Sequence, residues 1–433
     1  MTLRRLRKIA LRSATVWHDV RAILRTRYFL CPPVAPMQSL EDFALRKLRE
    51  LDRAQLHRVL VETDRVDGIW VRRNGRQLLS FCCNDYLNLT QHPAVKKAAT
   101  DAIARYGTGS GASRLVTGNH PLFAALEERL ARLKGTEAAC VFGSGYLANA
   151  GIVPALVGVG DLVLIDELAH ACLWAGARLA RVTLLPFRHG DASHAEALLT
   201  DHRSRHKHCL IATDGVFSMD GDLAPLPALA VLAQRFDAWL MADDAHGLGV
   251  VGGGRGSTFA HGMRVDVPLQ MGTLSKAIGA YGGYLCASSA VIDLIHNRAR
   301  TVVYSTGLPP AIAAAAMAAL DVIAQDAAYA ALPLAKAKRF TELARLPQAA
   351  SPIVPLIVGE ADAAMAAAEF LETKGFLVVA IRPPTVPKGT ARLRFTFSAG
   401  HPDDEIARLA EAVRAMAPSW MSHARLPAVA ALP

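Results

Sequence analysis

The chain has few cysteines, and their spacing is not that of a metal site or a disulfide framework. Seven cysteines are scattered over 433 residues, with no Cys-x-x-Cys pair and no His/Cys spacing typical of metal ligands. Such usage argues against a structural zinc site and against a disulfide-stapled secreted fold. We therefore predict a protein without a metal centre that works in a reducing compartment, the cytoplasm.

The chain also lacks a hydrophobic run long enough to cross a bilayer. Its longest apolar stretch, residues 308–320, is rich in alanine, contains two prolines near its start and is followed by Asp321. A membrane-spanning helix needs about 20 consecutive apolar residues. We predict a buried helix here and no membrane partner.

Positive charge is concentrated at the N-terminus. The formal net charge is +10, and residues 1–36 hold eight Lys or Arg against one acid. Such a segment could be a targeting peptide, a membrane-surface helix or a stretch read through from an earlier start codon. We favour the last interpretation, since Met37 follows a proline-rich break and opens an amphipathic helical pattern. The rest of the chain is only mildly basic, and we predict no nucleic-acid partner.

Apolar patterns alternate between strand and helix along the chain. Residues 69–81 resemble a hairpin around an Asn74-Gly75 turn, and residues 121–134 have the leucine spacing of a helix. Strand-like runs occur at 138–142, 162–165, 209–213, 239–243 and 353–358. Strands separated by helices predict an α/β fold with a parallel, doubly wound sheet. Because a chain of this length exceeds one compact core, a large domain plus a smaller one is expected.

One lysine lies on a turn bounded by glycines, Gly272-Thr-Leu-Ser-Lys276-Ala-Ile-Gly279. The glycines let backbone N–H groups approach a phosphate, and Thr273 and Ser275 can hydrogen-bond it. The Lys276 amine can form a Schiff base with an aldehyde cofactor. Taken alone, a lysine on such a turn is more often a solvated surface residue.

A second segment favours a cofactor-binding role for Lys276 over a solvated surface position. The apolar run 239–243 is predicted to be a buried strand that delivers Asp243, Asp244 and His246 to the crevice where open α/β sheets bind ligands. A carboxylate beside the pyridine nitrogen of pyridoxal phosphate holds the proton that the cofactor needs as an electron sink. A capped turn is the alternative for this segment, but both patterns in one chain favour pyridoxal phosphate as the cofactor.

Two further glycine-rich segments bear on the phosphate. The run 138–142 leads into Gly143-Ser-Gly-Tyr146, so the free N–H groups of a helix N-terminus could bind a phosphate there. An ordinary strand-to-helix connection is the alternative. The segment 107–114 alternates glycines but lacks the Gly-Lys-Ser/Thr ending of a nucleotide loop, which argues against nucleotide binding there.

These segments together resemble the α-oxoamine synthase family of fold-type I pyridoxal phosphate enzymes. The resemblance extends from about residue 37 to residue 417. It rests on Asn84-Asp-Tyr-Leu87, Gly109-Ser-Gly-Ala-Ser-Arg114, Ser144-Gly-Tyr146, Asp166-Glu-Leu-Ala-His170, Asp214-Gly-Val-Phe-Ser218-Met-Asp-Gly-Asp222, Asp243-Asp-Ala-His246, Gly272-Thr-Leu-Ser-Lys276, Tyr304-Ser-Thr306 and residues 380–394.

The resemblance implies a fold-type I aminotransferase-like fold. A large domain with a mostly parallel central sheet is expected at 84–305, followed by a smaller C-terminal α/β domain at 306–418. Residues 37–83 would form an N-terminal helix and hairpin, flanked by the extension 1–36 and a tail at 419–433.

The segment 380–394 indicates which members of the family this chain resembles most. It contains Ile381-Arg-Pro-Pro384 before Pro387-Lys-Gly-Thr-Ala-Arg-Leu-Arg394. Relatives that use other substrates share the second motif but usually lack the first. The resemblance therefore implies an acyltransferase of biotin biosynthesis, which condenses L-alanine with a pimeloyl thioester and releases carbon dioxide. Whether acyl-carrier protein or coenzyme A carries the acyl group stays open.

The resemblance also implies roles for individual residues. Lys276 would hold the cofactor and act as general base, His170 would stack on its ring, and Asp243 would pair with its pyridine nitrogen. His246 and Ser218 would hydrogen-bond the region of its phenolic oxygen.

The remaining family positions concern the phosphate and the substrates. Gly145, Tyr146 and Thr273 would hold the phosphate, with Thr306 from a partner subunit, so the active site would belong to a homodimer. Arg394 would clamp the alanine carboxylate, because a guanidinium fork matches a carboxylate. Candidates on the acyl side are Arg382, Thr385 and Arg58. The chain departs from the family at its ends and at Cys82-Cys83.

Overall fold

The computed structural model describes residues 38–54 and 56–416. Residue contacts divide the chain into two units, Met1–Val61 and Glu62–Pro433. In the first unit, the helix predicted after Met37 is confirmed as α2 (Gln38–Arg53), an amphipathic helix with no buried residue. The predictions for residues 1–36 and for the tail lie outside the described residues. The boundaries predicted within the second unit stay predictions.

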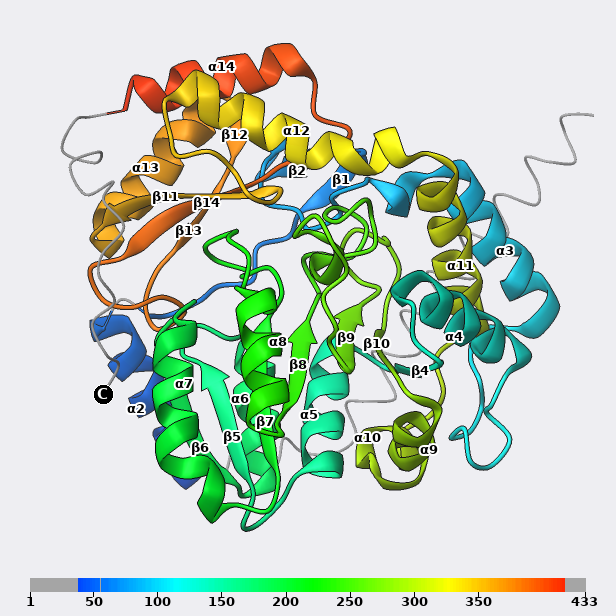
Figure 1. The fold of residues 1–433 in the computed structure, drawn as a ribbon. Helices are drawn as coiled ribbons and strands as arrows, with labels where there is room; N and C mark the ends of the chain where they lie inside the picture. The colour runs from blue at the N-terminus through cyan, green and yellow to red at the C-terminus, as the bar shows by residue number, and fades with distance from the viewer. Residues whose placement is uncertain (1–37, 55, 417–433) are drawn as a thin grey trace, which may run out of the picture. The chain divides into compact units, whose positions relative to one another are not determined.

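A seven-stranded sheet forms the centre of the second unit (Figure 1). Its strand order is β4-β10-β9-β8-β7-β5-β6. The five strands from β9 to β6 are parallel, whereas β10 is antiparallel to both β9 and β4. The predicted mostly parallel sheet is therefore confirmed. The strands are β4 (Ala138–Phe142), β5 (Leu162–Asp166), β6 (Thr183–Phe187), β7 (Cys209–Asp214), β8 (Trp239–Asp243), β9 (Leu269–Thr273) and β10 (Gly283–Ala287).

Helices cover both faces of this sheet, as the doubly wound prediction requires. Leu162 and Leu164 of β5 belong to a core cluster with α7 (Ala192–His202) and α8 (Leu226–Arg235). Val163 and Ile165 point to the opposite face and belong to a cluster with α5 (Gly145–Leu156) and α6 (Ala171–Ala180). Alternate side chains of one strand thus supply two cores. The carboxyl ends of β5, β7 and β8 remain available for a ligand site.

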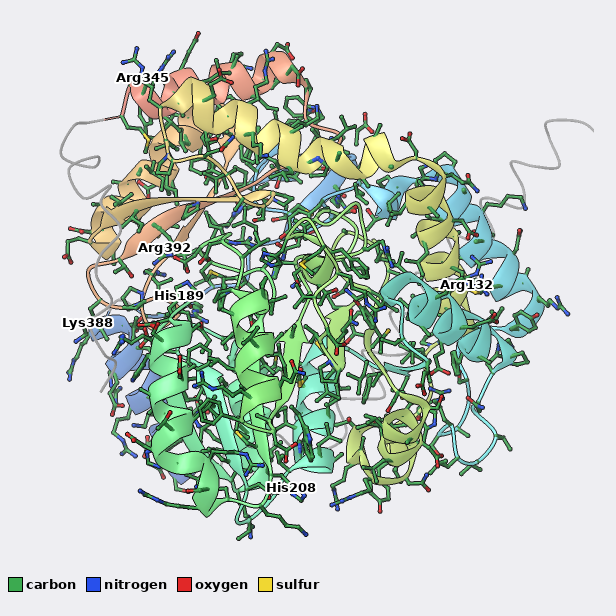
Figure 2. All side chains as sticks on the ribbon, in the orientation of Figure 1. Arg132, His189, His208, Arg345, Lys388 and Arg392 are labelled. Carbon is green, nitrogen blue, oxygen red and sulfur yellow. The ribbon has the colours of Figure 1, made fainter. Side chains whose placement is uncertain are left out.

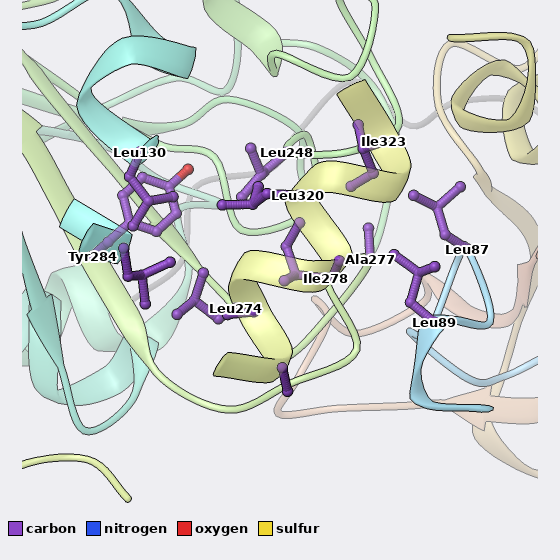
Figure 3. Packing of buried hydrophobic residues seen from close by; sticks show 14 of the residues in the cluster. Leu87, Leu89, Leu130, Leu248, Leu274, Ala277, Ile278, Tyr284, Leu320 and Ile323 are labelled. Atoms are coloured by element: carbon purple, nitrogen blue, oxygen red, sulfur yellow. The ribbon is translucent and has the colours of Figure 1, made fainter. Parts of the chain in front are cut away.

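A third cluster anchors the turn that carries Lys276 (Figure 3). Leu274, Ala277 and Ile278 are at most 1% exposed and pack against α11 (Pro310–Gln325) and residues such as Leu87. The buried helix predicted at 308–320 is confirmed as α11, which begins two residues later, at Pro310, and continues to Gln325. α3 (Pro93–Tyr106), α4 (Pro121–Lys134), α9 (Ser289–Arg298) and α10 (Arg300–Val303) complete this part of the unit.

The predicted hairpin is confirmed as β2 (Trp70–Arg73) and β3 (Arg76–Ser80). Asn74 and Gly75 have φ of 49° and 74°, the left-handed conformation that a two-residue hairpin turn needs. β1 (Asp64–Asp67) and β12 (Phe376–Leu377) extend the hairpin to a four-stranded sheet, in which β12 pairs parallel to β3. The hairpin segment and the C-terminal segment are thereby joined.

The strand predicted at 353–358 is confirmed as β11 (Ile353–Gly359), but it does not belong to the parallel sheet. It pairs antiparallel with β14 (Ala391–Thr396), which pairs antiparallel with β13 (Val379–Ile381). α12 (Ala327–Ala344), α13 (Ala361–Thr373) and α14 (Asp403–Arg414) share a core with this three-stranded sheet. An apolar run predicts a strand but carries no information about its partner strands.

Within the described ranges, no single helix is both long and apolar enough to cross a bilayer. Only α11 and α12 taken together have that length and composition, and they are bent by 84° at their junction.

Candidate active site

Lys276 lies at the mouth of the crevice, on the packed turn described above. Its side chain is partly buried, and its Nζ is 3.4 Å from Nε2 of His246. Burial lowers the pKa of Lys276; the positive charge of Arg394 lowers it further, whereas Asp243 opposes the change. A lowered pKa increases the fraction of neutral amine, which is the nucleophilic form.

Asp243 ends β8 with its side chain buried. The carboxylate accepts hydrogen bonds from Nδ2 of Asn149 at 2.7 Å and from the backbone N–H of Ala245 at 3.0 Å. Asp214 lies directly opposite Asp243 in the β7–β8 register. Burial raises the pKa of both carboxyl groups. A cation bound in the crevice would favour their ionised forms.

Asp244 does not reach the crevice, and the prediction that it does is wrong. Its carboxylate turns to the opposite side and accepts a hydrogen bond from Nζ of Lys134 at 2.7 Å, where both side chains are at most 1% exposed. The N–H of Ser257 also donates to it. Asp244 is the first residue after β8, and its buried pair with Lys134 holds its carboxylate away from the crevice, so that only Asp243 of the two reaches it.

His246 is buried between Lys276 and a buried tyrosine. Its Nδ1 is 2.7 Å from the hydroxyl of Tyr86. Burial, together with the charges of Lys276 and Arg394, places the pKa of His246 well below its usual value. The imidazole is therefore neutral at physiological pH.

His170 caps the N-terminus of α6, and its backbone N–H donates to Asp214 at 3.0 Å. Its ring Nδ1 is 2.8 Å from the sulfur of Cys172. Asn149 also donates to that sulfur, at 3.0 Å. Burial raises the pKa of Cys172 to about 12, so the thiol stays protonated. The prediction did not include Asp214, Asn149 or Cys172.

The start of α5 forms one wall of the crevice. Ser144 is the N-cap residue and accepts a hydrogen bond from the N–H of Leu147. The next two N–H groups, of Gly145 and Tyr146, begin the helix and have no acceptor within it. A Cβ on Gly145 would lie 3.3 Å from Cβ of Thr273, so glycine keeps this wall open. A phosphate would find here both N–H donors and the positive end of the helix dipole.

These elements enclose a cavity of about 160 Å³. Eight of the predicted residues line it together with six others. The predicted ones are Gly145, Tyr146, His170, Asp243, His246, Thr273, Ser275 and Lys276, and the others are Ser144, Cys172, Asp214, Val216, Ala245 and Met271. A lysine amine, a buried carboxylate and a helix N-terminus in one small cavity fit the aldehyde, the pyridine nitrogen and the phosphate of pyridoxal phosphate.

Arg394 is a buried cation without a carboxylate partner among the residues that the structure describes. It is 6% exposed, and both of its terminal nitrogens donate to Oδ1 of Asn84 at 3.2 Å. Its Nε donates to the carbonyl of Ser218. By contrast Arg392, labelled in Figure 2, lies two residues earlier on the same strand. It pairs with Asp220. A buried, unpaired guanidinium is costly unless a ligand supplies the anion.

The other predicted residues do not line this cavity. Ser218 contacts Arg394 through its backbone carbonyl. Thr306 is exposed and forms an isolated bridge with Ser113. In the loop after β13, the N–H of Thr385 donates to the carbonyl of Arg382 at 3.2 Å. Arg58 belongs to the first unit. Their predicted roles stay predictions.

The chain matches the family described as aminotransferase class I and II over residues 76–413. It is 61% identical over 383 residues to the 8-amino-7-oxononanoate synthase of Beijerinckia indica, which covers 88% of this chain and 99% of that protein. It is 66% identical over 344 residues to the enzyme of the same name from Methylocella silvestris, with 79% and 98% coverage.

Solved structures of two enzymes have a similar fold. The serine palmitoyltransferase of Sphingomonas wittichii superposes with a TM-score of 0.81 at 28% identity, covering 88% of this chain and 98% of that chain. The 8-amino-7-oxononanoate synthase of Francisella tularensis has a TM-score of 0.67 at 26% identity, with 78% and 97% coverage.

Proposed function

The chain belongs to the 8-amino-7-oxononanoate synthase family of the class I and II aminotransferases, and from this membership we propose how its residues perform the family reaction. The protein condenses L-alanine with a pimeloyl thioester, using pyridoxal phosphate, and releases carbon dioxide, the free thiol carrier and 8-amino-7-oxononanoate for biotin synthesis. One observation carries the residue assignment. Lys276, Asp243 and His246 line a single cavity. Arg394, which has no carboxylate partner in the described part of the chain, contacts His246 through one tyrosine hydroxyl.

Pyridoxal phosphate, when bound, supplies an electron sink that stabilises negative charge on the α-carbon of alanine. We assign its aldehyde to Lys276 and its pyridine nitrogen to Asp243. The N–H groups of Gly145 and Tyr146, with the hydroxyl of Thr273, would hold its phosphate, and the ring of His170 would cover one face. The fit of the cavity to these groups supports this assignment.

Three residues act on the amino acid in this proposal. Arg394 binds the alanine carboxylate with its guanidinium fork, which replaces an unpaired buried charge by a charge-assisted pair. Lys276, with its lowered pKa, accepts the α-proton as a neutral amine and later returns it. Asp243, desolvated and held by Asn149, keeps its negative charge when it faces a cation.

Three further assignments concern the partner subunit, the acyl chain and the cellular compartment. Thr306, which does not line the cavity of its own chain, would reach the phosphate of a partner subunit in a homodimer. Arg382 and Thr385, with Arg58, would bind the acyl chain, carried by acyl-carrier protein or coenzyme A. We also propose that the protein acts in the cytoplasm, because its cysteines are spaced for neither disulfides nor zinc.

A comparison of substrates tests this function. Carbon dioxide release is followed with pimeloyl, succinyl, acetyl and palmitoyl thioesters, each with alanine, glycine and serine. We expect pimeloyl thioester with alanine to be preferred. Glycine should be poor but not excluded, since one methyl group gives only about 1–3 kcal/mol of discrimination. A preference for glycine with succinyl or acetyl thioester would contradict the substrate assignment while leaving the cofactor chemistry intact.

A further inference from the structure

A buried chain of polar contacts joins Arg394 to Lys276 through Tyr86 and His246. A terminal nitrogen of Arg394 donates to the Tyr86 hydroxyl at 3.5 Å, and this hydroxyl lies 2.7 Å from Nδ1 of His246. On the other side of the imidazole, Nε2 lies 3.4 Å from Nζ of Lys276. Tyr86 is fully buried and does not line the cofactor cavity.

The donors in this series of contacts determine where each proton lies. Arg394 can only donate, so the Tyr86 oxygen is the acceptor of that contact. Burial raises the pKa of Tyr86 to about 12, so the phenol keeps its own proton and has one to donate. Its two possible acceptors are Nδ1 of His246 and Oδ1 of Asn84.

The distances favour Nδ1 of His246 over Oδ1 of Asn84 as the acceptor of the Tyr86 hydrogen bond. The hydroxyl lies 3.4 Å from Oδ1 of Asn84, an oxygen that already accepts two N–H groups of Arg394. At 2.7 Å, the contact with Nδ1 of His246 has the length of a strong hydrogen bond. Because His246 is neutral, an Nδ1 that accepts a hydrogen bond carries no proton, and the single ring proton is on Nε2.

We propose that Tyr86 is a positioning residue that fixes the ring tautomer of His246, so that Nε2–H faces the Lys276 amine. A donor in that place meets the lone pair of a neutral amine and is repelled by an ammonium group. Once the cofactor is bound, the same N–H points to the region assigned to its phenolic oxygen. The catalytic consequence rests on the proposed function, but the tautomer itself does not.

The test uses the full-length protein loaded with pyridoxal phosphate, with ¹⁵N-labelled histidine. The His246 signals are assigned by comparison with His246→Gln. We expect an unprotonated Nδ1 and a protonated Nε2 in the wild type. Tyr86→Phe removes the donor, so an Nδ1–H tautomer becomes populated. We expect kcat to fall by about tenfold or more, with a smaller change in the KM for alanine.

A matched control is available in the same core cluster. Tyr284 is equally buried, but its hydroxyl has no hydrogen-bond partner among the described residues. Tyr284→Phe removes the same atom without removing a hydrogen bond, and we expect it to leave the His246 signals and kcat as in the wild type. Thermal unfolding of both variants separates a local effect from a loss of folded protein.

Two results would overturn the inference. One is a wild-type His246 with its proton on Nδ1. The other is a Tyr86→Phe protein that keeps the wild-type tautomer, whatever its kcat. Failure of the wild type to release carbon dioxide from alanine and pimeloyl thioester would count against the proposed function. The tautomer shift in Tyr86→Phe would still support the role of Tyr86.

Discussion

Replacing His189 by glutamine should make the stability of the folded chain less dependent on pH. His189 follows β6, at the carboxyl edge of the central sheet (Figure 2). Its Nδ1 lies 3.1 Å from Asp166 and its Nε2 lies 2.9 Å from Asp222. Burial alone would lower the pKa of His189, but the two carboxylates raise it to about 10. The imidazolium therefore ties β5 to the loop that carries Ser218.

The size and sign of the effect follow from that pKa. One pKa unit corresponds to about 1.4 kcal/mol, so a rise from 6.5 to about 10 stabilises the folded chain by at most about 5 kcal/mol. A raised pKa gives full stabilisation below about pH 6.5, which is lost as the pH rises to 10. Between pH 7 and pH 9, about 2.5 kcal/mol of this maximum is lost. Since the Asp222 side chain is 46% exposed, solvent screening should reduce the loss to about 1–2 kcal/mol.

The assay is urea unfolding of the wild type and of His189→Gln at pH 7, 8 and 9. The quantity compared is the difference between their free energies of unfolding, because other titrating groups cancel in it. His208→Gln is the matched control, since His208 pairs with Asp161 at 3.0 Å but its side chain is 37% exposed. It lies at the opposite end of the sheet, just before β7 (Figure 2). We expect this control to cost at most about 1 kcal/mol.

Two results would contradict this prediction. In one, the free energy of unfolding of the wild type exceeds that of His189→Gln by the same amount at every pH; in the other, the difference is larger at pH 9 than at pH 7. Either result would mean that His189 is not held protonated by its two carboxylates. A pH-dependent difference for His208→Gln as large as that for His189→Gln would also refute it, because burial would then not decide the strength of the pair.

Other predictions concern the cavity. Lys276→Ala should bind pyridoxal phosphate without a covalent bond, seen by borohydride resistance, and lose at least about a thousandfold in turnover. Asp243→Asn should keep the cofactor's colour but turn over at least about a hundredfold more slowly, because an amide cannot hold the pyridinium proton; near-normal turnover would contradict its role. Arg394→Lys should raise the KM for alanine by about tenfold or more, whereas Arg392→Lys, at a guanidinium already paired with an aspartate, should not. Thr306→Ala should weaken cofactor binding by about fivefold to tenfold in an equilibrium titration, the effect of one lost hydrogen bond.

Local patterns made much of the central fold predictable. The Asn74-Gly75 turn, the leucine spacing of α4 and the apolar run before Asp243 each depend on neighbouring residues, and each prediction is confirmed. Partner strands are not a local property. The run at 353–358 is as apolar as a parallel strand, yet its antiparallel partner lies more than thirty residues away at β14.

The sequence predicts many of the residues that line the cavity, but not the residues that hold them in place. Residue type alone does not distinguish Arg392 from Arg394. Only the folded structure brings Asp220 to Arg392, whereas Arg394 has no carboxylate partner among residues 38–54 and 56–416. Asp214 could have been recognised, since it ends a buried strand as Asp243 does. Asn149 could not, because nothing in the sequence shows that a helix residue reaches a carboxylate 94 positions later.

The buried ion pair between Lys134 and Asp244 makes positions outside the catalytic cavity sensitive to substitution. Lys134 is the last residue of α4, outside the catalytic cavity, yet its partner is the residue next to Asp243. A Cβ on Gly247 or Gly256 would lie within 1.9 Å of the Asp244 carboxylate, so neither glycine tolerates a larger residue. Substituting Lys134 would leave a buried charge uncompensated, at a cost of about 3–5 kcal/mol. In a screen for altered substrate range, such variants would lose activity because they are unstable. Lys134 could then be mistaken for a residue of the substrate pocket. Mutant libraries are therefore better confined to the loop after β13, where exposed side chains such as Thr385 can vary without disturbing this pair.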